Sequence, residues 1–168
     1  NWSNFTKSII MKKLEVSGAA KLRGQIRISG SKNASLPILA ATLLSDKKIS
    51  LTNIPRVKDV ETMIKLLESM GSKVEVSKNK NSLVIQNNKI IKTEANYNLM
   101  STMRAGIIVL GPLLARFGKA RVSSPGGCNI GFRPIDIHLE ALKKMSVKYK
   151  IVDGYINANA KNGLIGAK

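Results

Sequence analysis

Residues 29–44, SGSKNASLPILAATLL, decide the fold of this chain. The part from residue 34 to residue 44 is apolar almost all the way round a helix, and such a helix must be buried on most of its sides. A second stretch of this kind, TMRAGIIVLGPLLARF, occupies residues 102–117. The sequence therefore predicts two buried helices, at residues 34–44 and 102–117, with the rest of the fold arranged around them.

The two buried helices belong to a longer internal repeat, which is the usual signature of a structural unit used more than once. An offset of 71 residues pairs Pro37 with Ile108, Leu39 with Leu110, Leu43 with Leu114, and Leu51 with Val122. Farther on, an offset of 75 pairs Val60 with Ile135, Ile64 with Leu139, Leu67 with Leu142, Met70 with Met145, and Val76 with Ile151. The second copy therefore carries a longer loop, at residues 123–134.

Each copy predicts the same order of elements after its buried helix. In the first copy, an amphipathic helix is capped by Asp59 and stopped near Gly71. Short alternating strands surround it, at Ile49 and Leu51, Val74 and Val76, and Leu83 and Ile85, with counterparts at Ala120 and Val122, Tyr149 and Ile151, and Ile156. Residues 14–16 and 25–29 also read as strands. We expect an α/β domain with helices inside and sheets outside.

The charge of the chain is extreme, with 28 Lys and Arg against 10 Asp and Glu and a formal net charge of +18. Such a balance favours anionic partners, and nucleic acid is the first candidate. The basic residues, however, are mostly scattered lysines, and aromatic residues make up only 4% of the chain, so no stacking platform emerges. We interpret the charge as a lysine-rich surface and predict no nucleic-acid partner.

The remaining composition indicates a soluble cytoplasmic protein without a membrane segment. Hydrophobic residues make up 43% of the chain, enough for a real core, and the longest apolar run, residues 105–115, is about half of a membrane helix. Cys128 and His138 are the only residues of their types, which predicts neither a disulfide framework nor a metal site. Residues 1–10 make a poor signal peptide, and we treat them as an extension outside the fold.

A cation stands at the start of each buried helix, Lys32 in the first and Arg104 in the second. Positive charge at a helix N-terminus opposes the macrodipole, and the conflict disappears if an anion binds there. Each cation alone could simply extend into water. Their nearly equivalent places in the two copies favour a shared site for phosphate or carboxylate.

The loop of the second copy supplies further candidates. In PGGC, residues 125–128, two glycines permit close approach by a ligand, and positive surroundings favour the Cys128 thiolate. A lone cysteine, however, is more often a small buried hydrophobe. Arg133 offers a fork for phosphate, and Asp136 can accept a hydrogen bond or simply complement a helix dipole. We expect His138 to be an ordinary surface residue.

Four motifs together closely resemble the UDP-N-acetylglucosamine enolpyruvyl transferases. They are SGSKNA at residues 29–34, TMRA at 102–105, GPLLARFG at 111–118, and PGGCNIGFRPIDIH at 125–138. The resemblance runs from Met11 to the end of the chain in order and with the family's spacing. The related 5-enolpyruvylshikimate-3-phosphate synthases lack this cysteine loop, so the resemblance favours a nucleotide-sugar substrate.

The resemblance implies a two-domain inside-out α/β barrel with the substrates in the cleft between its domains. Residues 1–10 would be the extension, 11–31 strands of the second domain, and 32–168 two of the three repeats of the first catalytic domain, so the barrel is incomplete here. The implied reaction adds the sugar 3′-hydroxyl to phosphoenolpyruvate and releases phosphate, at the start of peptidoglycan synthesis, with no metal or organic cofactor.

The resemblance also implies roles for individual residues. Lys32 and Asn33 would contact phosphoenolpyruvate, with Lys32 also catalytic, and Arg104 would anchor the anionic substrates. Cys128 would protonate the methylene carbon and be alkylated by fosfomycin. The uridine and diphosphate would bind Arg133, Pro134, Ile135, Asp136 and Ile137. The isolated chain should be inactive; the alternatives are a non-catalytic fragment and a basic nucleic-acid-binding module.

Overall fold

The two halves of the sequence fold into two α/β units of the same design. The structure, a computed structural model, describes residues 15, 18, 21, 23–78, 81–90, 92–124 and 135–167. The first unit consists of α1 (Lys32–Ala41), the 3-10 helix η1 (Thr42–Leu44), β1 (Ile49–Leu51), α2 (Lys58–Met70), β2 (Lys73–Val76) and β3 (Leu83–Gln86). The second consists of the 3-10 helix η2 (Arg104–Val109), α4 (Leu110–Phe117), β5 (Lys119–Ser123), α5 (Asp136–Lys144), β6 (Lys148–Val152) and β7 (Tyr155–Asn159). Between them lie β4 (Glu94–Ala95) and α3 (Tyr97–Met100).

Strand order confirms the internal repeat. The first sheet has the order β1-β3-β2, and the second has β4-β5-β7-β6, so β5, β7 and β6 occupy the places of β1, β3 and β2. Pairing is antiparallel within each set of three, and β4 joins β5 in parallel. The turn between the last two strands is tighter in the second unit, where Asp153 and Gly154 both have positive φ, 50° and 74°. This geometry suits a two-residue hairpin.

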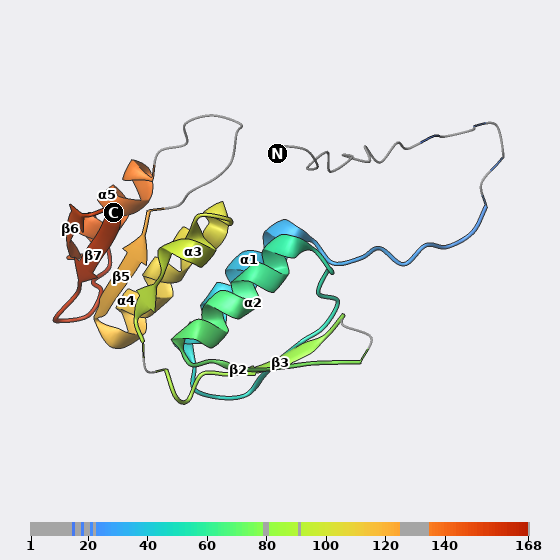
Figure 1. The fold of residues 1–168 in the computed structure, drawn as a ribbon, viewed down its shortest axis with the longest axis horizontal. Coiled ribbons are helices and arrows are strands. Elements are labelled where there is room, and N and C mark those ends of the chain that lie inside the picture. The colour runs from blue at the N-terminus through green and yellow to red at the C-terminus, as the bar shows by residue number, and fades with distance from the viewer. Residues whose placement is uncertain are drawn as a thin grey trace, which may run out of the picture.

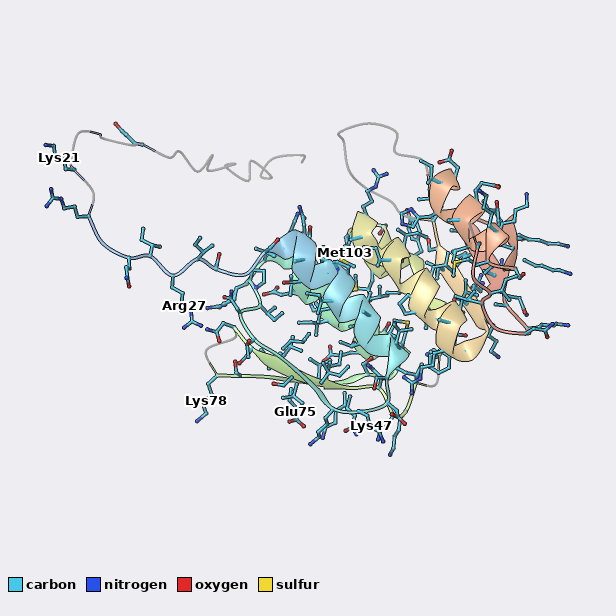
Figure 2. All side chains as sticks on the ribbon, turned by 180° about the vertical axis from the view of Figure 1, so that it is seen from behind. Lys21, Arg27, Lys47, Glu75, Lys78 and Met103 are labelled. Carbon is cyan, nitrogen blue, oxygen red and sulfur yellow. The ribbon has the colours of Figure 1, made fainter. Side chains whose placement is uncertain are left out.

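Helices α1, α2 and α4 lie between the two sheets, as Figure 1 shows, with β2 and β3 on one side and β5 and β7 on another. Leu39 and Leu43 of the first unit are fully buried, as are their repeat partners Leu110 and Leu114. Burial of these side chains is the main force holding the units together. The predicted order, helices inside and sheets outside, is confirmed, and Figure 2 shows the charged side chains of Glu75 and Lys78 on the outer side of the first sheet.

Three helix boundaries differ from the sequence prediction. Helix α1 begins at Lys32 rather than at residue 34, because Ser31 is its N-cap. The second buried helix begins at Arg104 rather than at residue 102, and it is 3-10 as far as Val109 before it becomes α-helical. Helix α2 begins at Lys58 after Val57, whose side chain makes no cap, so the assignment of Asp59 as the cap was wrong. Asp59 lies in the first turn, where a carboxylate still complements the dipole. The predicted stop at Gly71 is confirmed by its left-handed φ of 111°.

The predicted strand at residues 25–29 does not form. Figure 1 draws these residues as an extended trace, and no strand pairing is assigned to them within the part of the chain described. Ile26 and Ile28 are 89% and 81% exposed. Alternation alone suggested a strand, but a strand also needs a neighbour that supplies hydrogen bonds. Of the predicted strand at 14–16, only residue 15 is described.

Polar contacts join the ends of the buried helices. The side chain of Asn87 is fully buried; its Nδ2 donates to the carbonyl oxygen of Thr42 at 2.7 Å, and its Oδ1 accepts from Ser72 Oγ at 2.6 Å. Arg116 Nη1 donates to the carbonyl oxygens of Leu43 and Ser45, at 2.8 and 3.0 Å. These bonds fix the C-terminal ends of the helices, so their starts gather at the opposite end. Within the described residues, no helix is long and apolar enough to cross a membrane.

Candidate functional site

The start of α1 is built by the SGSKNA motif. Ser31 is the N-cap, and its Oγ accepts a hydrogen bond from the backbone N–H of Ala34 at 3.3 Å. The hydroxyl of Ser35 donates to the Ser31 carbonyl oxygen at 2.8 Å, which tightens the first turn. Lys32 and Asn33 are the first two helical residues, and both are exposed. The motif therefore places a cation and an amide at an accessible helix start.

The ammonium of Lys32 forms an ion pair with Asp59 of α2. Its Nζ lies 2.9 Å from Asp59 Oδ2, and the two side chains are 47% and 37% exposed. The pair joins residues 27 positions apart in the sequence. It shows that α1 and α2 begin at the same end of the helix layer.

Close backbone contact fixes the approach to α1. A Cβ at Gly30 would overlap the carbonyl oxygen of Asn53 and lie 2.9 Å from the Asn53 carbonyl carbon, so only glycine fits there without movement. Asn53 has a φ of 57°, a left-handed value that asparagine tolerates better than most residues. The segment that precedes Lys32 is thereby packed directly on the segment that leads to α2.

The start of the second buried helix lies at the same end. Helix α1 packs against η2, and η1, at the end of α1, packs against α4, where Arg116 makes its contacts. The two buried helices therefore run in the same direction. Arg104, the first residue of η2, is half-buried, and Met103 before it is buried among the helices, as Figure 2 shows. The structure thus brings Lys32 and Arg104 to one end of the molecule's helix layer.

The other predicted site residues lie at or before α5. Asp136 is its first residue and Ile135 its N-cap; Asp136 is exposed, and Ile137 is 77% exposed although it is apolar. His138 is exposed, as expected of an ordinary surface residue. Cys128, Arg133 and Pro134 lie outside the described residues.

Sequence reasoning missed the contact between Asp59 and Lys32. Nothing in the local sequence links Asp59 to Lys32, because their contact depends on how two helices pack. It also missed a cluster beside α3, where Arg121 pairs with Glu94 and its guanidinium carbon lies 3.8 Å from the ring centroid of Tyr155. The Tyr155 hydroxyl accepts from the backbone N–H of Tyr97 at 3.3 Å. This cluster braces the segment that leads to Arg104.

Comparison with known proteins identifies the family. A family model described as EPSP synthase (3-phosphoshikimate 1-carboxyvinyltransferase) matches residues 16–167. The chain belongs to this family.

Curated proteins also match the chain at high identity. The chain is 73% identical over 157 residues to a UDP-N-acetylglucosamine 1-carboxyvinyltransferase of Pelagibacter ubique (strain HTCC1062), with 94% of the chain covered. It is 53% identical over 162 residues to the protein of the same name from Sulfurovum sp. (strain NBC37-1). The chain spans 37% of the length of each of these relatives.

Two solved structures of enolpyruvyl transferases share the fold. The enolpyruvyl transferase NikO from Streptomyces tendae superimposes with a TM-score of 0.71 at 18% identity, covering 88% of this chain and 32% of NikO. EPSP synthase from Acinetobacter baumannii gives a TM-score of 0.62 at 15% identity, covering 85% and 33%. The predicted inside-out α/β fold is therefore confirmed, and the chain forms part of it.

Proposed function

We propose that this chain supplies part of the active site of a UDP-N-acetylglucosamine 1-carboxyvinyltransferase. That enzyme transfers the enolpyruvyl group of phosphoenolpyruvate to the 3′-hydroxyl of UDP-N-acetylglucosamine, the first committed step of peptidoglycan synthesis. One observation carries the choice of substrate: 73% identity to a protein of that name over 94% of the chain. The 15% identity to a solved EPSP synthase supports only the shared fold.

The arrangement at the helix starts suits phosphoenolpyruvate, which carries both a phosphate and a carboxylate. Lys32 and Arg104 lie at one end of two parallel helices whose N-termini add further positive potential. Asn33, beside Lys32, offers an amide that can donate to an anionic oxygen. We assign phosphoenolpyruvate binding to these three residues, and charge stabilisation at the reacting group to Lys32.

The reaction proceeds by addition and elimination. The sugar 3′-hydroxyl gives its proton to a base in the part of the enzyme outside this chain as its oxygen bonds to the central carbon of phosphoenolpyruvate, while Cys128 gives a proton to the methylene carbon, which leaves a tetrahedral intermediate. A base then takes a proton from the methyl carbon as phosphate leaves, which restores the carbon–carbon double bond on the sugar. The uridine and diphosphate bind Arg133, Pro134, Ile135, Asp136 and Ile137, and the exposed apolar side chain of Ile137 suits contact with a nucleotide.

The segment before α1 fits an association with a second domain. Residues 25–29 are extended, and the exposed Ile26 and Ile28 lie two positions apart, as on one face of a strand. We assign residues 11–31 to strands of that second domain, 32–168 to two of three repeats of the first catalytic domain, and 1–10 to an extension outside the fold. The enzyme works in the cytoplasm, where both substrates are made, and the 168-residue chain alone is inactive.

A chimera tests this proposal. Residues 11–168 would replace the matching segment of the Pelagibacter ubique relative, whose 73% identity makes the new interfaces compatible. We expect phosphate release that requires both phosphoenolpyruvate and UDP-N-acetylglucosamine, and loss of that activity on alkylation of Cys128 by fosfomycin. Activity with shikimate 3-phosphate instead would overturn the substrate assignment. Turnover by the chain alone would overturn the dependence on a second domain.

The net charge of +18 is compatible with one alternative function, that of a basic nucleic-acid-binding module. Such a module would bind arbitrary duplex DNA with an affinity that falls steeply as salt is raised from about 50 to 200 mM. Enolpyruvyl transfer predicts only weak DNA binding and protection of the chain by the nucleotide sugar. Fluorescence anisotropy with a labelled duplex separates the two.

A further inference from the structure

We propose that Asp59 is a positioning residue, whose carboxylate holds the Lys32 ammonium in the orientation that receives the anionic substrate. The inference rests on the proposed function, because it assigns Asp59 a part in the same site. The observation behind it is the ion pair of 2.9 Å between Lys32 Nζ and Asp59 Oδ2.

Lys32 needs such a partner because of where it stands. A lysine ammonium is a compact charge on a flexible stem with four carbons, and its conformation is easily lost to solvent. At the first position of α1 the positive helix end also repels it. The carboxylate of Asp59 offsets that repulsion and uses one of the three N–H donors. The other two donors are then available to a phosphate or carboxylate.

Asp59 is itself held where a carboxylate is favoured. It is the second residue of α2, and negative charge in a first helical turn complements the macrodipole. The segment before α2 is anchored by the Ile54 N–H, which donates to the Asn81 carbonyl oxygen at 2.8 Å. Gly30 packs on Asn53, so this backbone contact fixes the starts of α1 and α2 relative to each other. The position of the Asp59 carboxylate is thus set by the fold.

A contribution to stability does not account for this ion pair. Partly exposed pairs of this kind add little to folding, because solvent screens them. Lys73 and Glu75 form a comparable pair at 3.0 Å within β2, where it joins near neighbours of one strand and touches no candidate site residue. The pair at the helix starts, by contrast, links a substrate-binding candidate to another helix, so its role is best sought in the site.

The charge of Asp59 gives the proposal a distinctive kinetic signature. A negative group beside the site repels the anionic substrate in the ground state, while the oriented ammonium stabilises the charge that develops during reaction. Removal of the carboxylate should therefore lower kcat and leave the KM for phosphoenolpyruvate unchanged or lower. A merely structural role would instead reduce the amount of folded enzyme, without lowering kcat while KM stays unchanged or falls.

The chimera described above provides the kinetic test. For Asp59→Asn we expect kcat to fall by about tenfold to a hundredfold, the scale of a misplaced catalytic group, with no rise in the KM for phosphoenolpyruvate. Asp59→Glu should recover most of the loss, and Glu75→Gln, which removes the comparison ion pair, should change neither constant. A kcat for Asp59→Asn within about twofold of the parent would overturn the proposal.

A second measurement uses the 168-residue chain itself and needs no activity. The ammonium 1H–15N signal of Lys32, assigned by its disappearance in Lys32→Arg, should report restricted motion in the parent and free motion in Asp59→Asn. Equal mobility in both would overturn the positioning role. An inactive chimera that retains the restricted Lys32 signal would count against the proposed function and leave the contact itself established.

Discussion

Arg116 Nη1 donates to the carbonyl oxygen of Leu43 at 2.8 Å, so the end of the second buried helix caps the end of the first. The same nitrogen also reaches the carbonyl oxygen of Ser45 at 3.0 Å. Because helix-end carbonyls lack partners within their own helix, this contact satisfies groups that would otherwise be left to solvent. It joins the two copies of the repeat through one side chain.

Replacement of Arg116 by methionine should therefore destabilise the chain. We expect a loss of about 1.5–3 kcal/mol in the free energy of unfolding, the usual range for hydrogen bonds made by a charged group. Urea denaturation followed by circular dichroism measures it. Arg56→Met is the matched control, since Arg56 is exposed and its side chain lies outside the helix junction. Equal losses for both variants would contradict the capping role.

Asn87 offers a second test of how the first unit is held together. Asn87→Ala leaves the Ser72 hydroxyl and the Thr42 carbonyl oxygen without their buried partner, at a cost of about 1–3 kcal/mol for each unsatisfied group. The adjacent Asn88 is exposed, so Asn88→Ala should change stability by less than about 0.5 kcal/mol. Thermal unfolding of the two variants measures this difference in stability between neighbouring residues of the same type.

The repeat made much of this architecture predictable. The buried pairs Leu39 with Leu110 and Leu43 with Leu114 were visible in the sequence, because burial on all sides leaves an uninterrupted apolar pattern. The order of helices and strands along the chain was predicted from the same repeat, whereas the order of strands within each sheet was not. Lys32 and Arg104 were identified as helix-start cations from the same alignment of the two copies.

What escaped prediction depends on contacts between distant segments. Asp59 was read as a local cap, whereas packing of α2 on α1 makes it the partner of Lys32. The short elements β4 and α3 carry too few residues for any periodicity to show. Residues 25–29 have strand-like alternation, yet local pattern cannot reveal whether a neighbouring strand exists.

Two glycines of the second buried helix should respond oppositely to alanine. A Cβ at Gly106 would overlap the sulfur of Met100 and lie 3.0 Å from its terminal methyl, so Gly106→Ala should cost about 1–3 kcal/mol through overpacking. At Gly111, inside α4, a Cβ meets nothing within 4 Å. Gly111→Ala should stabilise by about 0.5–1 kcal/mol, because alanine is the better helix former. Chemical denaturation measures the free energy of unfolding of both variants. Unchanged stability of Gly106→Ala would contradict the packing described for Met100, and destabilisation by Gly111→Ala would contradict the open space at that position.

Gly30→Ala should damage the site more than the fold. The added methyl must displace the carbonyl oxygen of Asn53, and that movement separates the segment before Lys32 from the segment that carries Asp59. Since a misplacement of about 1 Å can cost about a hundredfold in rate, we expect a large fall in the kcat of the chimera even if it stays folded at the assay temperature. Gly166→Ala, where a Cβ meets nothing within 4 Å, controls for the substitution itself. If Gly30→Ala retained full activity while the restricted Lys32 ammonium signal was lost, the geometry of the ion pair would be irrelevant to catalysis, and the link between this backbone contact and the chemistry would fail.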